Sequence, residues 1–209
     1  MEETKKEESG KEKKVGKGRS AARDLCYIAL FAAIIAVCAW ISVPVGDIPV
    51  TLQTMGVCLA AAFLGLKRGT AAVAVYILLG LCGVPVFAGF TGGAAKLLMP
   101  TGGYIVGFIF TALVVGGVSD AVGERIKSAW ARAGILAAAM AVGVAVCYAF
   151  GTAWFMILYN RADRSVTLAG ALMMCVVPYL LPDFVKIIAA SLLVSRLKKY
   201  MRKGNRQSR

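Results

Sequence analysis

Two side chains of opposite charge stand in an otherwise apolar stretch near the end of the chain. Asp183 and Lys186 are three residues apart, so they share one face of a helix, and Tyr179, four residues before Asp183, shares it too. A charged group in hydrocarbon is costly unless it is paired or hydrated. The pair is therefore either a structural ion pair near a helix end or part of a binding site that uses both signs of charge, and we favour the binding site.

Two further segments break the apolar pattern. Residues 43–54 contain two prolines and a glycine, which predict an irregular loop, and they end in Thr51, Gln53 and Thr54. Residues 80–104 hold seven glycines around a single cation, Lys96, and are otherwise apolar. Within a membrane, irregular backbone and polar groups persist only where protein or a water-filled cavity receives them. The first segment is either an ordinary loop or a pocket cover, and the second predicts a re-entrant or pocket-lining loop.

The residue types present argue against catalysis. The chain has no histidine, which removes the Ser-His-Asp and Cys-His arrangements and histidine-ligated metals. Its six cysteines lie inside apolar blocks without close pairs, so neither a metal site nor a disulfide framework is indicated. The glycines around Lys96 do not form a P-loop, because two alanines separate Gly93 from Lys96 and Leu97 follows. We therefore expect no enzyme, no resident cofactor and no ATPase in this chain.

Composition defines the class of protein that must position these groups. Of the 209 residues, 59% are hydrophobic and 17% are charged, and the mean hydropathy is +0.73. Soluble domains are about a quarter charged and about half apolar, so a soluble enzyme, a disordered chain and a secreted disulfide scaffold are all disfavoured. The chain is predicted to be an all-α, polytopic membrane protein.

Six apolar segments are long enough, or nearly so, to cross a bilayer as helices. They cover residues 25–46, 48–66, 69–84, 101–119, 133–159 and 170–195. We expect a disordered charged tail over residues 1–21, a six-helix membrane domain over residues 22–200 and a basic tail over residues 201–209.

The distribution of positive charge predicts the orientation. The net charge of +13 would suit nucleic acid, but most Lys and Arg residues lie in the tails and in the loops on one side of the six predicted helices. That side carries 20 of them and the opposite side carries three. Because cytoplasmic loops are enriched in Lys and Arg, both termini are expected to lie in the cytoplasm. The chain itself is expected to be a multi-pass protein of the plasma membrane. We expect no nucleic-acid partner.

Small residues in the first predicted helix form two overlapping AxxxA patterns. One joins Ala29 to Ala33 and the other joins Ala32 to Ala36. Such spacing lets two membrane helices approach closely, although alanine is common enough in membrane helices that chance also produces it.

Several motifs in order resemble the BioY family, the biotin-binding S components of energy-coupling factor (ECF) transporters. The resemblance covers about residues 22–200. The motifs that carry it are IPVTLQT at 48–54, LG with GVPVFAG at 79–89, PTGGY with GF at 100–108, and PDxxK at 182–186.

The resemblance implies a fold and a set of partners. It implies six membrane helices, cytoplasmic termini, a biotin pocket near the extracellular face, and pocket-forming loops 1 (residues 43–50) and 3 (residues 80–104). It also implies an energising module of one membrane coupling protein and two ATPases. Ala29 and Ala33 would contact the coupling protein.

The residues on the expected pocket surface match the chemistry of biotin. Its bicyclic ring needs apolar walls, its ureido group needs hydrogen-bond partners, and its carboxylate needs a cation. The expected ligand-binding residues are Phe87, Phe90 and Tyr104 as walls, Gln53, Thr54 or Thr91 as hydrogen-bonding groups, and Asp183, Lys186 and Tyr179 on the last helix. Lys186 could meet the carboxylate, and Asp183 could accept from N–H groups or hold Lys186. Which polar group meets which end of biotin stays open.

Three alternatives remain at this stage. The chain could be an S component for another small vitamin. It could also be an integral membrane enzyme, although Asp183 is the only embedded acid and too few groups accompany it. A non-enzymatic membrane assembly protein is the third alternative, for which a buried Asp/Lys pair would be superfluous.

Overall fold

The computed structural model describes the backbone of residues 2–44, 48–122, 126, 128–161 and 166–207, and side chains within these ranges from residue 21 to residue 198. Most of this backbone is helical, as predicted. The elements in chain order are α1 (Glu2–Trp40), β1 (Ser42–Val43), β2 (Val50–Thr51), α2 (Gln53–Leu81), the 3-10 helix η1 (Ala94–Leu98), α3 (Gly102–Val122), α4 (Ala129–Arg161), α5 (Leu168–Cys175) and α6 (Val177–Gln207).

Five of the described helices are long and apolar enough to cross a membrane. One of them, α2, covers most of the second and the third predicted segments. It is not a single straight rod, because the Gln53 side chain donates a hydrogen bond to the Tyr76 hydroxyl at 2.7 Å. Residues 23 apart in a straight helix would lie about 35 Å apart. The two halves of α2 therefore fold back on each other. That the chain crosses the membrane six times stays a prediction.

Gly65 makes this reversal. Its φ of 80° and ψ of −173° are non-helical, and such a φ is open mainly to glycine. The Asp120 carboxylate of α3 accepts the Leu66 N–H at 2.9 Å, and the neighbouring Ser119 hydroxyl donates to the Ala62 carbonyl at 2.6 Å. Backbone groups released at the turn thus find side-chain partners on α3.

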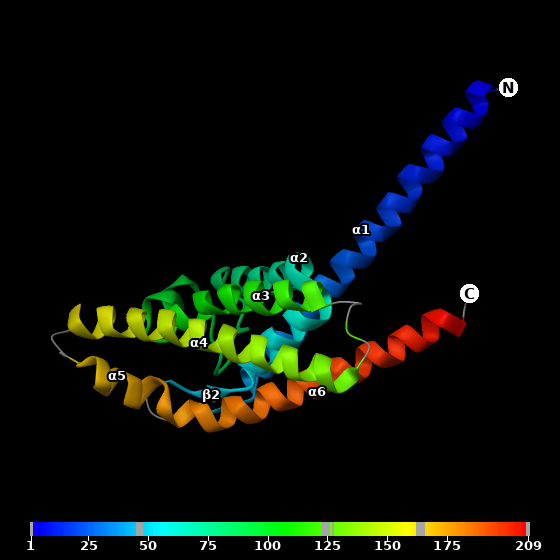
Figure 1. Cartoon of the computed structure of the whole chain (residues 1–209). Helices are drawn as coiled ribbons and strands as arrows, with labels where there is room; N and C mark the ends of the chain where they lie inside the picture. The colour runs from blue at the N-terminus through cyan, green and yellow to red at the C-terminus, as the bar shows by residue number, and fades with distance from the viewer. Residues whose placement is uncertain (1, 45–47, 123–125, 127, 162–165, 208–209) are drawn as a thin grey trace.

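The helices form a closed bundle. Helix α1 packs on α2, α2 on α3 and α3 on α4, and α6 returns to contact both α4 and α2. Figure 1 shows that both ends of the chain lie at the same end of this bundle. Small residues permit the close approach of the helices, as where Gly69 lies against Ala61 within the α2 hairpin.

Two of the boundaries that differ from the predictions lie beside the pocket. Helix α1 ends at Trp40, not at residue 46, and β1 and β2 follow as a short antiparallel pair in which Ser42 faces Thr51. Residues 45–47 of the predicted pocket cover lie outside the described residues. The sixth predicted segment is broken at Val176 into α5 and α6, because Pro178 has no N–H to continue the hydrogen bonds of α5, whereas a proline fits in the first turn of the next helix.

The N-terminal tail is helical in its backbone, which continues α1 from Glu2 onward. The expected disorder of residues 1–21 stays a prediction. This helix extends well beyond the bundle (Figure 1). Lysine and glutamate dominate the tail, and both have high intrinsic helix propensity.

Candidate ligand-binding site

A pocket lies between both irregular loops and helices α2 to α6. It encloses about 750 Å³ of space, its open mouth included. Its lining is mostly apolar with a few placed polar groups, as is usual for small-molecule sites. The lining residues are Ile48, Pro49, Thr51, Gln53, Thr54, Phe87, Ala88, Lys96, Thr101, Tyr104, Ile105, Phe108, Val144, Cys147, Tyr148, Cys175, Tyr179, Asp183 and Lys186.

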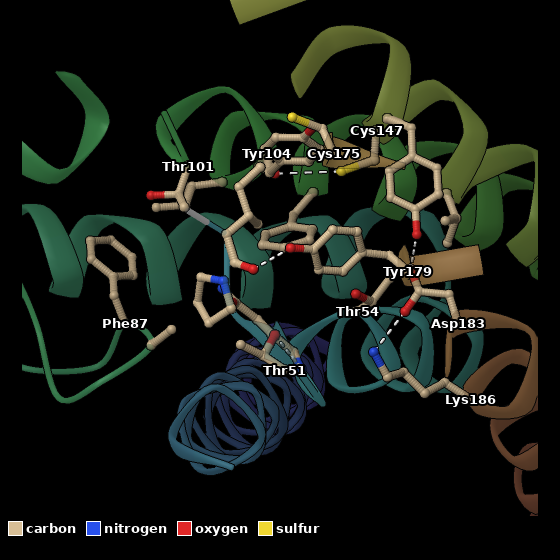
Figure 2. A pocket seen from close by; sticks show the side chains of 18 of the residues that line it. Thr51, Thr54, Phe87, Thr101, Tyr104, Cys147, Cys175, Tyr179, Asp183 and Lys186 are labelled. Carbon is tan, nitrogen blue, oxygen red and sulfur yellow. Dashed lines mark hydrogen bonds and ion pairs between the residues drawn. The ribbon is translucent and has the colours of Figure 1, made fainter. Parts of the chain in front are cut away.

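A buried ion pair forms one end of the pocket. The Lys186 ammonium lies 2.7 Å from Asp183 Oδ1, and the two side chains are 9% and 8% exposed (Figure 2). The Tyr148 hydroxyl of α4 donates to the second oxygen of Asp183. The carboxylate is thus held from two sides, and the charges of the pair cancel.

The pair's position follows from local sequence. Pro182 lies inside α6, and it removes one helical N–H without ending the helix. Asp183 and Lys186 then lie on the face of α6 that packs toward α2 and α4, so both are shielded from lipid. Tyr179, one turn earlier, donates through its hydroxyl to the Ile48 carbonyl and thereby joins α6 to the first loop.

A second polar chain runs from α2 to loop 3, the segment that links α2 to α3. The Gln53 amide donates to the Tyr76 hydroxyl, which donates to the Val86 carbonyl at 3.2 Å. Phe87 follows, and its ring packs edge-on against Tyr76 with centroids 5.6 Å apart. Gly80 lies under this ring, and any Cβ there would overlap it. These contacts hold Phe87, 1% exposed, at the pocket wall.

Different residues lie at the two ends of the pocket. In Figure 2, Phe87 and Thr101 lie at the end opposite Asp183 and Lys186. Tyr104 lies in the wall, where its hydroxyl pairs with Thr152 at 3.3 Å and its ring meets Tyr148 edge-on at 6.5 Å.

Seven of the nine predicted ligand-binding residues line the pocket together, and two do not. Phe90 is 64% exposed and stacks on Trp40, and the Thr91 hydroxyl donates to the Ala88 carbonyl at 2.9 Å. A tight turn at Gly89 and Phe90, both with positive φ, carries these two residues to the outside of loop 3. The prediction that Phe90 walls the ring is therefore not supported by its position.

The structure adds residues that the sequence reasoning did not select. Lys96 and Tyr148 are the most informative of them, because each brings a polar group to an apolar wall. Lys96 carried a visible signal, since it is the single cation in the glycine-rich segment. Tyr148 carried none, because tyrosine is ordinary in an apolar helix. Among the described residues, no group of three His, Cys, Asp or Glu side chains could hold a metal ion.

The fold and the pocket together define a multi-pass membrane protein with a mostly apolar pocket among its helices. The family model described as "BioY family" matches residues 8–203. The chain therefore belongs to the BioY family.

Curated relatives and a solved structure agree with this assignment. The chain is 42% identical to "Biotin transporter BioY" of Thermotoga maritima, over 85% of this chain and 96% of that protein. It is 35% identical to "Probable biotin transporter BioY" of Pyrococcus horikoshii, over 85% and 97% respectively. The solved "S-component for biotin from an ECF-type ABC transporter" superposes with a TM-score of 0.72 at 28% identity, covering 87% of this chain and 93% of that one.

Proposed function

We propose that this protein takes up biotin as the membrane-embedded substrate-binding subunit of an ECF-type transporter. The observation that carries the proposal is the pocket, which combines apolar walls with separate polar groups. The relatives named as biotin transporters support the choice of ligand. We infer binding rather than catalysis, since Asp183 is already engaged by Lys186 and Tyr148.

The polar groups suggest how biotin lies. The Asp183–Lys186 pair is charge-neutral, and it presents acceptors beside donors, which suits the neutral ureido group with its two N–H groups and one carbonyl. Tyr148 supports that role by fixing the second oxygen of Asp183. Gln53, Thr54 and Tyr179 lie along the same pocket and complete the polar lining.

The carboxylate of biotin needs a cation whose charge is not already matched. Two cations line the pocket, and Lys186 is paired. Lys96 makes no ion pair within the described part of the chain. It belongs to the loop that also carries Thr101, which lies at the far end of the pocket from Asp183 (Figure 2). We therefore assign the carboxylate to Lys96 and the ureido group to the pair on α6.

The test is equilibrium binding of tritiated biotin to the purified protein in detergent. Saturable binding that unlabelled biotin displaces, and that other vitamins in excess do not, is the expected result. Folded protein without saturable binding would refute the proposal, and displacement by another vitamin would redirect it to that ligand.

Transport against a gradient needs an energy source outside this chain. We propose one membrane coupling protein and two ATPases as partners, in keeping with the absence of a nucleotide-binding motif in the sequence. Helix α1 offers a contact face, because Ala29 and Ala33 are exposed whereas Ala32 and Ala36 are buried at 3% and 6%. One AxxxA pair, Ala29 and Ala33, thus lies on the outer face of α1, and the other, Ala32 and Ala36, faces the bundle.

Replacing Ala29 and Ala33 by leucine should lower biotin uptake in cells and leave biotin binding by the isolated protein nearly unchanged. The added side chains would hold a partner helix away from α1 without touching the pocket. Uptake and detergent binding measured on the same variant check this. The matched control is Ala32→Leu, which should impair folding because that position is buried. Equal loss of binding and uptake in the exposed pair would place these alanines in the fold instead.

We also propose that both termini lie in the cytoplasm. The 20-to-3 asymmetry of Lys and Arg supports this orientation. A reporter fused after Arg209 that is active only in the cytoplasm should be active, and one that matures only outside the membrane should be silent. The opposite pair of results would reverse the orientation.

A further inference from the structure

Trp40 joins two parts of the chain that are distant in sequence. It is the last residue of α1, and its indole N–H donates to the Pro85 carbonyl of loop 3 at 2.9 Å, across 45 positions. Its ring also stacks on Phe90, with centroids 5.0 Å apart and planes 22° apart. Trp40 is not among the residues that line the pocket.

The segment that Trp40 contacts is the part of loop 3 that forms a wall of the pocket. Between Pro85 and Phe90 lie Phe87 and Ala88, both of which line it. The segment closes on itself, because Phe87 and Thr91 pair as an isolated antiparallel bridge. A displacement of Pro85 or Phe90 therefore moves the pocket wall with it.

Phe90 has a backbone conformation that needs support. Its φ is +55°, and it is the one described non-glycine residue with positive φ. This region is strained for a residue with a side chain, and it persists when the surroundings over-determine it. The stacked indole is the contact that holds the exposed ring of Phe90.

The same end of α1 is also hydrogen-bonded to the first loop. The carbonyl of Ile41, next to Trp40, accepts the Leu52 N–H at 3.1 Å, and Ser42 pairs with Thr51, which lines the pocket. Both loops over the pocket are therefore attached to one point, the C-terminal end of α1.

We propose that Trp40 is a positioning residue that keeps loop 3 closed over the ligand and ties its opening to the position of α1. The inference rests on the proposed function for the identity of the ligand, biotin, but not for the mechanics of the loop. It also connects the pocket to the outer face of α1, which carries Ala29 and Ala33. A partner helix that shifts α1 would shift loop 3 through Trp40 and the first loop through the adjoining Ile41 and Ser42.

The first test is the dissociation rate of biotin from detergent-solubilised variants. Trp40→Ala should release biotin about tenfold faster, the size expected for one stacked pair and one hydrogen bond. Trp40→Phe retains a ring for Phe90 and should fall between wild type and alanine. Phe90→Ala should accelerate release about threefold through the lost stacking alone. The double variant should be no faster than Trp40→Ala, because both changes remove one shared contact.

The matched control is Trp130→Ala, which removes a tryptophan that is 75% exposed at the start of α4. It should leave the dissociation rate unchanged. Thermal unfolding without ligand separates a positioning role from a general loss of stability. A wild-type rate in Trp40→Ala, or equal acceleration by Trp130→Ala, would overturn the inference.

Amide hydrogen exchange tests the loop without any ligand. Amides of residues 86–91 should exchange faster in Trp40→Ala than in wild type, since the loop opens more often when its anchor is lost. Unchanged exchange there would also overturn the inference. If wild-type protein fails to bind biotin while this exchange rises, the proposed ligand is wrong and the role of Trp40 stands.

Discussion

Replacing Asp183 by asparagine, or Lys186 by methionine, should weaken biotin binding by roughly 30-fold to several thousand-fold. Each change leaves the other charge buried without its partner, and truncating one member of a desolvated charge pair costs about 2–5 kcal/mol. Both side chains are less than a tenth exposed, so water does not replace the missing partner. Equilibrium binding to folded protein in detergent measures the effect.

The controls for this prediction lie on the same helix. Ser191→Ala changes a buried α6 residue whose hydroxyl donates to the Ile188 carbonyl, outside the pocket, and should bind biotin normally. The Asp183→Asn, Lys186→Met double variant carries no uncompensated charge and should be more stable than either single variant. Wild-type affinity in both single variants would show that the pair is structural and would move the binding site to the two loops.

Replacing Lys96 by methionine should weaken binding of free biotin by roughly 10-fold to 150-fold, the range for a hydrogen bond to a charged group. The affinity for a biotin amide, which carries no carboxylate, should stay close to wild type. The reason is that Lys96 is the lining cation without an ion-pair partner among the described residues. Competition binding with both ligands gives the two affinities from one preparation.

The same measurement on Lys186→Met distinguishes the two assignments of the carboxylate. If Lys96 meets it, Lys186→Met weakens both ligands by the same factor and the preference for free biotin survives. If Lys186 meets it, as the sequence alone allowed, that preference disappears in Lys186→Met and survives in Lys96→Met. Lys96→Arg retains the charge and should restore part of the binding.

The charged pair on α6 could be found from the sequence because charge in an apolar helix is rare and expensive. The same reasoning could not find Tyr148, since its importance arises only where α4 brings it against Asp183. Nor could it separate Phe87 from Phe90. Both rings occupy the same apolar loop, and the turn at Gly89 decides which of them reaches the pocket.

The helices were predictable from hydropathy, and the break inside α2 lies within a few residues of the prediction. The sequence predicted two segments separated near residues 67–68, where two positive charges lie. The reversal occurs at Gly65, because Asp120 of α3 accepts the Leu66 N–H there. That partner is 54 positions away, and local pattern carries no information about it.

Neutralisation of Asp183 by Lys186 has an electrical consequence for the pocket. If Lys96 meets the carboxylate as we propose, the empty pocket carries one positive charge and the loaded pocket carries none. A unit charge crossing a potential of 100 mV changes its free energy by about 2.3 kcal/mol. Any movement of the pocket along the membrane normal is then electrically silent for these groups when it is loaded. When it is empty, the same movement would carry one charge, so membrane voltage would act on these groups only in the unloaded state.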